Sequence, residues 1–330
     1  MTKQGWDSSS APTPIGGNMI LFTADWHIKL GQKNVPVEWA LNRYKMFLDQ
    51  IKNIEYDIHI VGGDVFDRMP SLAELGVYFD FLSQVDSTTI IYDGNHEATK
   101  KNKTFFDLLK GVSQDISSEV EIVTQTKEFY NFTILPYADL HLKDSIEKCN
   151  KDLALFTHVR GEIPPHVKPE VDLDRFNDFP IVFAGDLHNH NNSQRNIVYP
   201  GSPMTTSFHR NKVDTGFLTI NPSDLTDWEW NKFELPQLIR KTVTAQEEMV
   251  KTPYDHTIYE IEGDLQKLST VSNSDLLDKK IVKRNSEVSI NLVDKTIEEE
   301  LYTYLEEVLE VKGDALSATM EVFNAYSRGS

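Results

Sequence analysis

Short apolar runs alternate with helical patterns over the first two thirds of the chain. Five runs are rich in apolar, β-branched and aromatic residues, as strands buried on both faces should be. They span residues 19–24, 57–62, 88–92, 153–157 and 180–184. Residues 37–51 carry helical periodicity, and a capping box that starts at Ser71 opens a helix over residues 72–85. Strands that alternate with helices predict a layered α/β core.

The pattern changes after about residue 222. Segments with strand character at residues 227–235, 256–263 and 286–293 predict a second, smaller α/β unit. A basic cluster lies between the last two segments and consists of Lys279, Lys280, Lys283 and Arg284.

The last part of the chain is acidic and helical. Thr296 and Glu299 form another capping box. One face of the helix that follows is apolar and carries Ile297, Leu301, Leu305, Val308 and Leu309. A second helix follows Gly313, with an apolar stripe of Leu316, Met320 and Phe323.

These patterns divide the chain into four segments. Residues 1–18 are small, polar and rich in Pro and Gly, which predicts a disordered or non-native leader before Met19. Residues 19–222 form the larger domain, residues 223–294 the smaller α/β domain, and residues 295–330 a helical tail.

Composition narrows the class of protein. The 330 residues suffice for one large and one smaller domain. No apolar run reaches membrane-spanning length, and the amino terminus lacks the pattern of a secretory signal. The single cysteine, Cys149, excludes an internal disulfide and suits a reducing compartment. We therefore expect a cytoplasmic protein without membrane association.

The formal net charge of −18 argues against a nucleic-acid partner, because phosphate backbones are bound mainly by Lys and Arg. Net charge, however, averages over the surface, and local charge decides binding. Basic residues gather in two loops, which contain Lys100, Lys101 and Lys103, and His209, Arg210 and Lys212.

Residues suited to metal binding follow each of the five apolar runs. They are Asp25 and His27, Asp64 and Asp67, Asn95 and His96, His158, and finally Asp186, His188 and His190. Each motif alone can be explained as an ordinary turn or as a buried core histidine. Loops that follow buried strands in α/β sheets converge on one crevice. The joint occurrence of these motifs, in order and each at a strand exit, therefore predicts one site.

The residue types also indicate a reaction. Carboxylate, imidazole and amide ligands suit Mn²⁺, Fe or Zn²⁺, and one carboxylate can bridge two ions. Two ions about 3.5–4 Å apart can generate a hydroxide nucleophile and neutralise the charge of a phosphoryl group, which is phosphoester hydrolysis. His96 stands next to a ligand and is the natural proton donor or transition-state stabiliser.

The ordered motifs DxH, GDxxD, GNHE, a single His and a GHxH-like element resemble those of the calcineurin-like metallophosphoesterases. Within that superfamily, YPGSPMTTSF (residues 199–208) is similar to the SbcD-type nucleases, the bacterial and phage counterparts of the eukaryotic meiotic-recombination nuclease. The likeness covers residues 19–222 by motif. It implies a four-layer β-sandwich flanked by helices, with a smaller α/β capping domain and C-terminal helices.

The resemblance also implies a ligand set for each ion. One ion would have Asp25, His27, Asp64 and His188, and the other Asp64, Asn95, His158 and residue 186, so that Asp64 bridges the two. The two divalent ions would most simply be Mn²⁺, with Mg²⁺ as the other choice.

This chain departs from the GHxH pattern, because Asp186 stands where the family has histidine. Either Asp186 serves as an oxygen ligand, or the site shifts to His188 and His190. We favour Asp186, because it leaves its strand at the same point as Asp25 leaves its own. An aspartate there should also favour Mn²⁺ or Mg²⁺.

Asp67 stands where some relatives carry histidine. It is either directly involved in catalysis or an acceptor that orients a ligand imidazole.

The family likeness implies a Mn²⁺-dependent 3′-to-5′ duplex exonuclease with endonuclease activity, acting in DNA repair, recombination or replication. The partner would be an SMC-like ATPase of the SbcC type, bound by the tail helices, and two copies would form a homodimer within a heterotetramer. The tail helices could instead fold back on their own domain. Compact size and a short tail favour a phage-encoded version, which would act in the host cytoplasm.

Two other functions stay open at this point. A stand-alone phosphoesterase acting on a nucleotide, a small phosphate compound or a phosphoprotein fits the net charge better. A non-enzymatic scaffold would be expected to lack ligands, whereas only position 186 deviates, and its aspartate can still coordinate.

Overall fold

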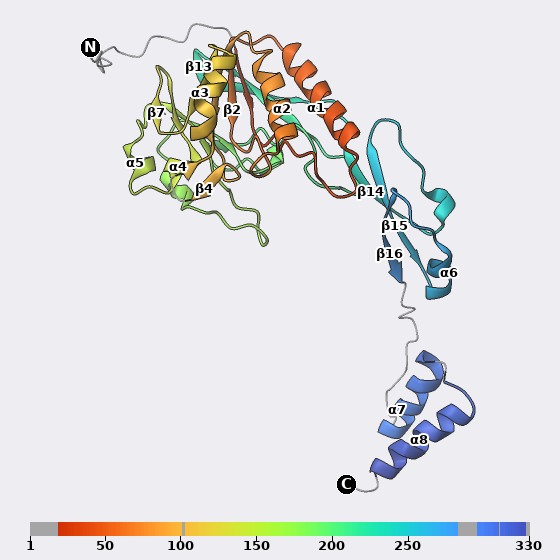
Figure 1. Ribbon diagram of the computed structural model, residues 1–330. Helices are drawn as coiled ribbons and strands as arrows, with labels where there is room; N and C mark the ends of the chain where they lie inside the picture. Colours follow the sequence, from red (N-terminus) through yellow and green to blue (C-terminus); the bar gives the residue numbers. More distant parts are fainter. Residues whose placement is uncertain (1–18, 101–102, 283–295, 310, 328–330) are drawn as a thin grey trace.

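The computed structural model describes residues 19–100, 103–282, 296–309 and 311–327 (Figure 1). The expected leader at residues 1–18 and the expected strand at 286–293 lie outside the described residues, as do Lys101, Lys283 and Arg284.

A six-stranded sheet forms the first half of the larger domain. Its strand order is β13-β12-β1-β2-β3-β6, in which β1, β2, β3 and β6 are parallel and β12 is antiparallel to both of its neighbours, β1 and β13. The strands are β1 (Ile20–Thr23), β2 (Ile58–Gly62), β3 (Thr88–Tyr92), β6 (Val120–Val123), β12 (Gly216–Asn221) and β13 (Asp224–Lys232).

A five-stranded sheet of order β11-β10-β9-β8-β7 packs against the first. It contains β7 (Lys127–Glu128), β8 (Phe132–Leu135), β9 (Ala154–His158), β10 (Val182–Gly185) and β11 (Ile197–Val198). Only β7 is antiparallel to its neighbour. The five runs predicted from the sequence are therefore strands, but they are divided between two sheets.

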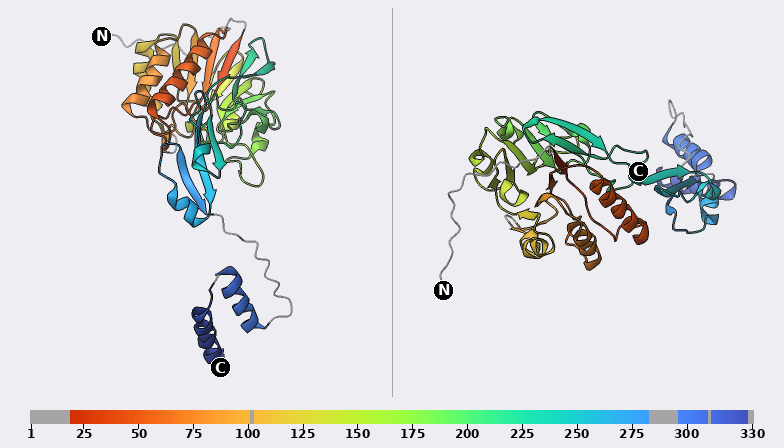
Figure 2. Two further views of the ribbon diagram at one scale, coloured as in Figure 1. Left: turned by 90° about the vertical axis from the view of Figure 1, so that its right-hand side faces the viewer. Right: turned by 90° about the horizontal axis from the view of Figure 1, so that it is seen from above.

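Alternating side chains build three apolar layers around the two sheets. In β1, Phe22 points into the core between the sheets, where its ring meets Phe156 at 5.2 Å, while Leu21 faces the helices. The helices on the outer face of the first sheet are α1 (Val37–Lys52), α2 (Leu72–Leu82) and α3 (Phe106–Ile116). Short helices cover the second sheet, namely α4 (Tyr137–Leu140), α5 (Ser145–Lys148) and the 3₁₀ helix η1 (Leu173–Phe176). The four-layer α/β sandwich is thus confirmed (Figures 1 and 2).

The capping box of Ser71 and Glu74 is present as expected, although α2 ends at Leu82 instead of residue 85. Glu74 also accepts a hydrogen bond from the backbone N–H of Leu30, so the cap joins the helix to the loop after β1. A two-stranded ribbon, β4 (Ala98–Lys100) and β5 (Lys103–Thr104), precedes α3, and the 3₁₀ turn η2 (His190–Asn192) precedes β11.

The smaller unit begins later than the sequence suggests. The strand expected at residues 227–235 as part of this unit is β13, which pairs with β12 in the first sheet. Its Trp228 and Trp230 pack against the core between the sheets, and this burial determines where the strand pairs. The unit itself is a parallel sheet of β14 (Leu238–Val243), β15 (His256–Gly263) and β16 (Leu277–Val282), with η3 (Gln246–Glu248) and α6 (Leu265–Thr270).

The loop between β11 and β12 makes hydrogen bonds to both the larger and the smaller unit. The backbone of His209 exchanges hydrogen bonds with Leu238 and Arg240 at the start of β14. Thr205 in the same loop accepts hydrogen bonds from the buried Arg43 of α1 and from the Leu238 backbone. This loop therefore contacts both units.

The tail forms α7 (Ile297–Thr303), the π-helical turn η4 (Tyr304–Val308) and α8 (Asp314–Ser327). The capping box of Thr296 and Glu299 is confirmed. Leu305 and Leu316 are buried, whereas Ile297 and Leu309 of the expected apolar face are exposed. No helix in the described part of the chain is long and apolar enough to cross a membrane.

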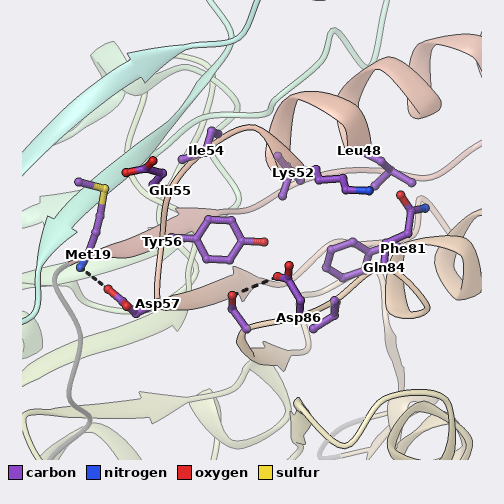
Figure 3. A pocket seen from close by; sticks show the side chains of 13 residues that line it. Met19, Leu48, Lys52, Ile54, Glu55, Tyr56, Asp57, Phe81, Gln84 and Asp86 are labelled. Carbon is purple, nitrogen blue, oxygen red and sulfur yellow. Dashed lines mark hydrogen bonds between the residues drawn. The ribbon is translucent and has the colours of Figure 1, made fainter.

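A cavity of about 390 Å³ lies near the amino ends of β2 and β3. Figure 3 shows the Tyr56 ring lying across it, between Asp57 and Asp86. No histidine lines this cavity, and the residues predicted to bind metal follow the opposite, carboxyl ends of the strands.

Candidate metal centre

The loops after β1, β2, β3, β9 and β10 bring the predicted side chains together. Three overlapping groups could each hold an ion, with ligand atoms all within 4.8 Å of one another. The groups are Asp25, His27 and His188; His27, Asp64 and His96; and Asp25, Asp64 and His158. These side chains come from both sheets, so the sandwich itself assembles the site.

Four of the predicted residues hold left-handed backbone conformations. Their φ angles are 58° at Asp25, 45° at His27, 49° at Asp64 and 102° at Asp186. Such conformations are unfavourable for residues with a Cβ and persist only where the surroundings enforce them. Hydrogen bonds enforce them here, from the Asp25 N–H to the Gly63 carbonyl and from the His27 N–H to the Asp64 carbonyl. Strain concentrated in this way is typical of a functional site.

Asp64 lies at the middle of the cluster. Its Oδ2 is 3.5 Å from His158 Nε2, 3.7 Å from His27 Nε2 and 3.8 Å from His96 Nε2. Burial alone would raise the pKa of the Asp64 carboxyl, but the three imidazoles outweigh it and lower that pKa. Asp64 therefore belongs to two of the three groups that could hold an ion.

Asp25 is completely buried beside Asp64. Burial raises the pKa of its carboxyl well above the ordinary value, and the neighbouring Asp64 and Asp186 add to this rise. Adjacent buried carboxylates are costly without compensating positive charge. The protein supplies part of it through His158, whose pKa is raised by Asp64 and Asp25 against the effect of burial. Divalent cations would supply the rest.

The histidines are oriented as metal-binding imidazoles usually are. His158 Nδ1 donates to the Gly62 carbonyl at 2.9 Å, which leaves Nε2 directed toward Asp64 and toward Asn95 Oδ1 at 3.0 Å. His188 Nδ1 lies 3.1 Å from the Thr206 hydroxyl, and its Nε2 is 3.0 Å from His27 Nε2. Each of these two residues therefore has one ring nitrogen held from outside and one facing the cluster.

Asp67 lies behind His27. Its Oδ1 is 3.6 Å from His27 Nδ1, and its Oδ2 is 2.7 Å from Lys29 Nζ. Burial would raise the pKa of the Asp67 carboxyl, but His27 and Lys29 lower it. Asp67 belongs to none of the three groups, and its place favours the orienting role over direct contact with substrate.

His96 lies at the open side of the cluster, with 35% of its side chain exposed. Its Nδ1 donates to the Asp67 carbonyl at 2.5 Å, and its backbone N–H donates to Asp64 Oδ1. Nε2 therefore faces the centre from a position that substrate can reach. A pocket of about 120 Å³, lined in part by His188, Thr206 and His209, opens beside the cluster.

Asp186 and His190 occupy different places relative to the candidate metal centre. Asp186 lies beside the centre, with its backbone N–H bonded to the Asp25 carboxylate and its Oδ1 4.0 Å from His158 Nε2. His190 instead donates from Nδ1 to the Tyr199 carbonyl and stacks on Trp230. This placement favours Asp186 over His190 as the additional ligand.

Two residues that the sequence did not single out also shape the site. Glu97 is fully buried and accepts hydrogen bonds from the backbone N–H groups of Asp64, Phe66 and Gly94. Burial, followed by the charge of Asp64, raises the pKa of the Glu97 carboxyl to about 8. Glu97 is the last residue of GNHE, so its position was visible in the motif but its burial was not. The other residue, Arg160, pairs with Asp186.

Glycine 94 allows this close packing, since a Cβ there would lie 2.3 Å from Asp64 Oδ1. The resulting set of carboxylate oxygens, imidazole nitrogens and one amide oxygen fits divalent ions such as Mn²⁺, Fe²⁺ or Zn²⁺. The residues present therefore fit a pair of divalent metals.

Comparisons with known proteins agree with this geometry. The family model described as calcineurin-like phosphoesterase matches residues 19–190. A protein of Escherichia phage T5 named "Probable exonuclease subunit 1" is 42% identical over 302 residues, which is 88% of this chain and 92% of that protein. A protein of Invertebrate iridescent virus 6 described as a phosphoesterase is 26% identical over 225 residues, covering 61% of this chain and 75% of that protein.

The assignment of residue 186 can be tested by substitution. We expect Asp186→Ala to lower metal-dependent hydrolysis of bis(p-nitrophenyl) phosphate by about a hundredfold or more, because both a ligand oxygen and its hydrogen bonds are lost. His190→Ala should keep most of the activity, since His190 packs on Trp230 away from the cluster. Initial rates in Mn²⁺ decide the matter, and the reverse ranking of the two variants would overturn the assignment.

Proposed function

Because the chain belongs to the calcineurin-like phosphoesterase family, we propose that it is the two-metal nuclease subunit of a DNA-processing complex. The observation that carries this proposal is the meeting of five strand exits around Asp64. The name of the phage T5 relative favours DNA over a small phosphate compound as substrate. By the likeness noted above, the activity would be a 3′-to-5′ double-strand exonuclease and an endonuclease.

The residues divide between two ions in this proposal. One ion would be held by Asp25, His27, Asp64 and His188, and the other by Asp64, Asn95, His158 and Asp186. When bound, such ions stabilise the charge of the phosphoryl transition state and activate water. Mn²⁺ suits the mixed oxygen and nitrogen ligands best, and Mg²⁺ is the second choice.

The remaining residues of the site act on substrate or on the ligands. His96 presents Nε2 at the open side, where a protonated imidazole can donate to the departing oxygen. Its anchoring by the Asp67 carbonyl fixes the direction of that proton. The Asp67 carboxylate lies 3.6 Å from His27 Nδ1 and would help to orient that ring.

The net charge of −18 bears on the choice of partner. Lys29 beside the centre pairs with Asp67, and in the basic loop at residues 209–212 Arg210 pairs with Glu260 and Lys212 with Asp255. These three cations are neutralised by their partners and so add little attraction for a long polyanion, which favours a second protein that shares the contacts with DNA. We propose that this partner is an SMC-like ATPase of the SbcC type and that the complex acts in DNA repair, recombination or replication in the host cytoplasm.

The other parts of the chain have roles in this proposal as well. The three-stranded unit of β14, β15 and β16 would act as the DNA-capping domain, because the loop whose His209 bonds to the start of β14 also carries Thr206, the partner of His188. The tail helices would bind the ATPase.

A stand-alone phosphoesterase acting on a nucleotide or a phosphoprotein is the second candidate. The observation that favours it is the excess of acidic residues, which disfavours binding of a long polyanion. Both candidates use the same centre, so only the substrate separates them.

Digestion of DNA distinguishes the two candidates. Linear duplex DNA incubated with the protein and Mn²⁺ should be degraded, and a chelator or the Asp64→Ala substitution should stop the reaction. Gel analysis of end-labelled DNA follows the products. Intact DNA together with turnover of p-nitrophenyl phosphate or a cyclic dinucleotide would instead identify the second function.

The tail offers apolar surface for a partner. Ile297 is 74% exposed, Leu309 53% and Val322 60%, whereas Leu305 and Leu316 are buried. We expect a protein that ends at residue 294 to keep its Mn²⁺-dependent nuclease activity but to lose copurification with the ATPase. Glu306→Ala, a change at an exposed charge, serves as the control. Copurification that survives the truncation would contradict the assignment of the tail.

Helix α3 offers a surface for a second copy. Leu108 is 79% exposed, Val112 46% and Ile116 37%, and their spacing of four residues places them on one helical face. A self-complementary apolar stripe suits a two-fold dimer. Leu108→Glu with Val112→Glu should therefore shift the protein from dimer to monomer in light scattering after size exclusion, whereas Lys110→Glu on the same helix should not. A monomeric wild-type protein at micromolar concentration would exclude this dimer.

A further inference from the structure

Arg160 forms a two-bond ion pair with Asp186 at the rim of the metal centre. Its Nε donates to Asp186 Oδ2 and its Nη2 to Oδ1, each at 3.2 Å. The carboxylate side chain is only 6% exposed, but the arginine side chain is 43% exposed. One edge of the guanidinium thus faces the buried carboxylate. The remaining nitrogen, Nη1, makes no hydrogen bond to the described residues of the chain.

The backbone around Arg160 is fixed by Glu170. The Arg160 N–H donates to Glu170 Oε1 at 2.8 Å. The Tyr137 hydroxyl donates to Glu170 Oε2 at 3.1 Å, and His141 Nε2 lies 3.3 Å from the same oxygen. Tyr137 also places its ring edge-on to His158, with the centroids 6.1 Å apart. Arg160 therefore extends from a well-supported segment directly beside a predicted metal ligand.

The aspartate at position 186 and this arginine form a matched pair. A histidine at 186 would have one free ring nitrogen after binding a metal and could not accept two parallel N–H bonds. A carboxylate has about four acceptor positions, so Asp186 can face the centre and hold Arg160 at the same time. The pair also balances charge, because Asp186 adds a negative charge beside Asp25 and Asp64, and Arg160 offsets it.

We propose that Arg160 binds a phosphate oxygen of the substrate strand through its free edge, and that Asp186 fixes the orientation of the guanidinium. This inference rests on the proposed nuclease function. It deepens that function by assigning a substrate contact to the position where the chain departs from the GHxH pattern. The planar guanidinium can contact carboxylate and phosphate through different edges, which the single ammonium of a lysine cannot do with the same geometry.

The test compares Arg160→Gln, Arg160→Lys, Asp186→His and the double variant Arg160→Gln with Asp186→His. Arg175→Gln is the matched control, since Arg175 makes a similar two-bond pair with Glu147 on the outer layer of the sandwich. For each full-length protein, kcat and KM on DNA are measured with the salt dependence of DNA binding. Mn²⁺ affinity is measured separately by calorimetry.

We expect Arg160→Gln to raise KM for DNA about tenfold, with kcat changed only about threefold or less. The slope of log affinity against log salt should fall by about one phosphate contact. Mn²⁺ should bind at least as tightly as before, because Arg160 no longer competes for Asp186. Arg160→Lys should not restore KM, and Asp186→His should raise KM to the same extent without a further rise in the double variant.

Other results would overturn the proposal. An unchanged KM and salt slope in Arg160→Gln would exclude the phosphate contact. If Mn²⁺ affinity and melting temperature both fell while KM rose, Arg160 would have only a structural role. Failure of the proposed function is recognised separately, because wild-type protein would then leave DNA intact while hydrolysing bis(p-nitrophenyl) phosphate. The KM of Arg160→Gln for that diester would in this case still decide the phosphate contact.

Discussion

The structure depends on the burial of carboxylates next to one another where strands from two sheets end. Asp25 and Asp64 are almost inaccessible to solvent, and only imidazoles and bound cations can compensate their charge. The left-handed backbone at four residues of the site costs on the order of 1–3 kcal/mol each. Glu97 helps to maintain it by holding the N–H groups of Asp64 and Gly94. The three apolar layers of the sandwich supply the rigidity against which this strain is held.

Much of the fold and of the site follows from the sequence. Continuous apolar runs identify the strands, and candidate ligands close after each strand identify the site, because both signals are local. Pairing between distant strands is not local. The alternation of aromatic and polar residues around Trp228 and Trp230 predicts a strand but not the strand with which it pairs. The burial of these two rings against the core places the strand in the first sheet. The family likeness implied a sandwich of two sheets, but which of the five strands belongs to which sheet was not predicted, for the same reason.

The site shows the same limit at the level of side chains. Spacing placed Asp186 and His190 in one loop, but contacts outside that loop separate their roles. Arg160 holds Asp186 beside the centre, and Tyr199 with Trp230 holds His190 away from it. The local sequence around Glu97 and Arg160 does not reveal how important these two residues are. Their importance lies in burial and pairing, which only the assembled fold determines.

Electrostatics connects the centre to its substrate in a way that the net charge of the chain does not reveal. Replacing a neutral imidazole by Asp186 makes the centre one charge more negative, which would weaken its attraction for a phosphodiester. Arg160 reverses this change within hydrogen-bonding distance of the carboxylate. The compensating positive charge lies on the exposed side chain of Arg160, at the rim of the centre, where substrate can reach it. Arg160 is paired with a buried anion and its backbone is held by Glu170, so in the proposed function its guanidinium would be oriented before substrate binds and little ordering would remain to be done on binding.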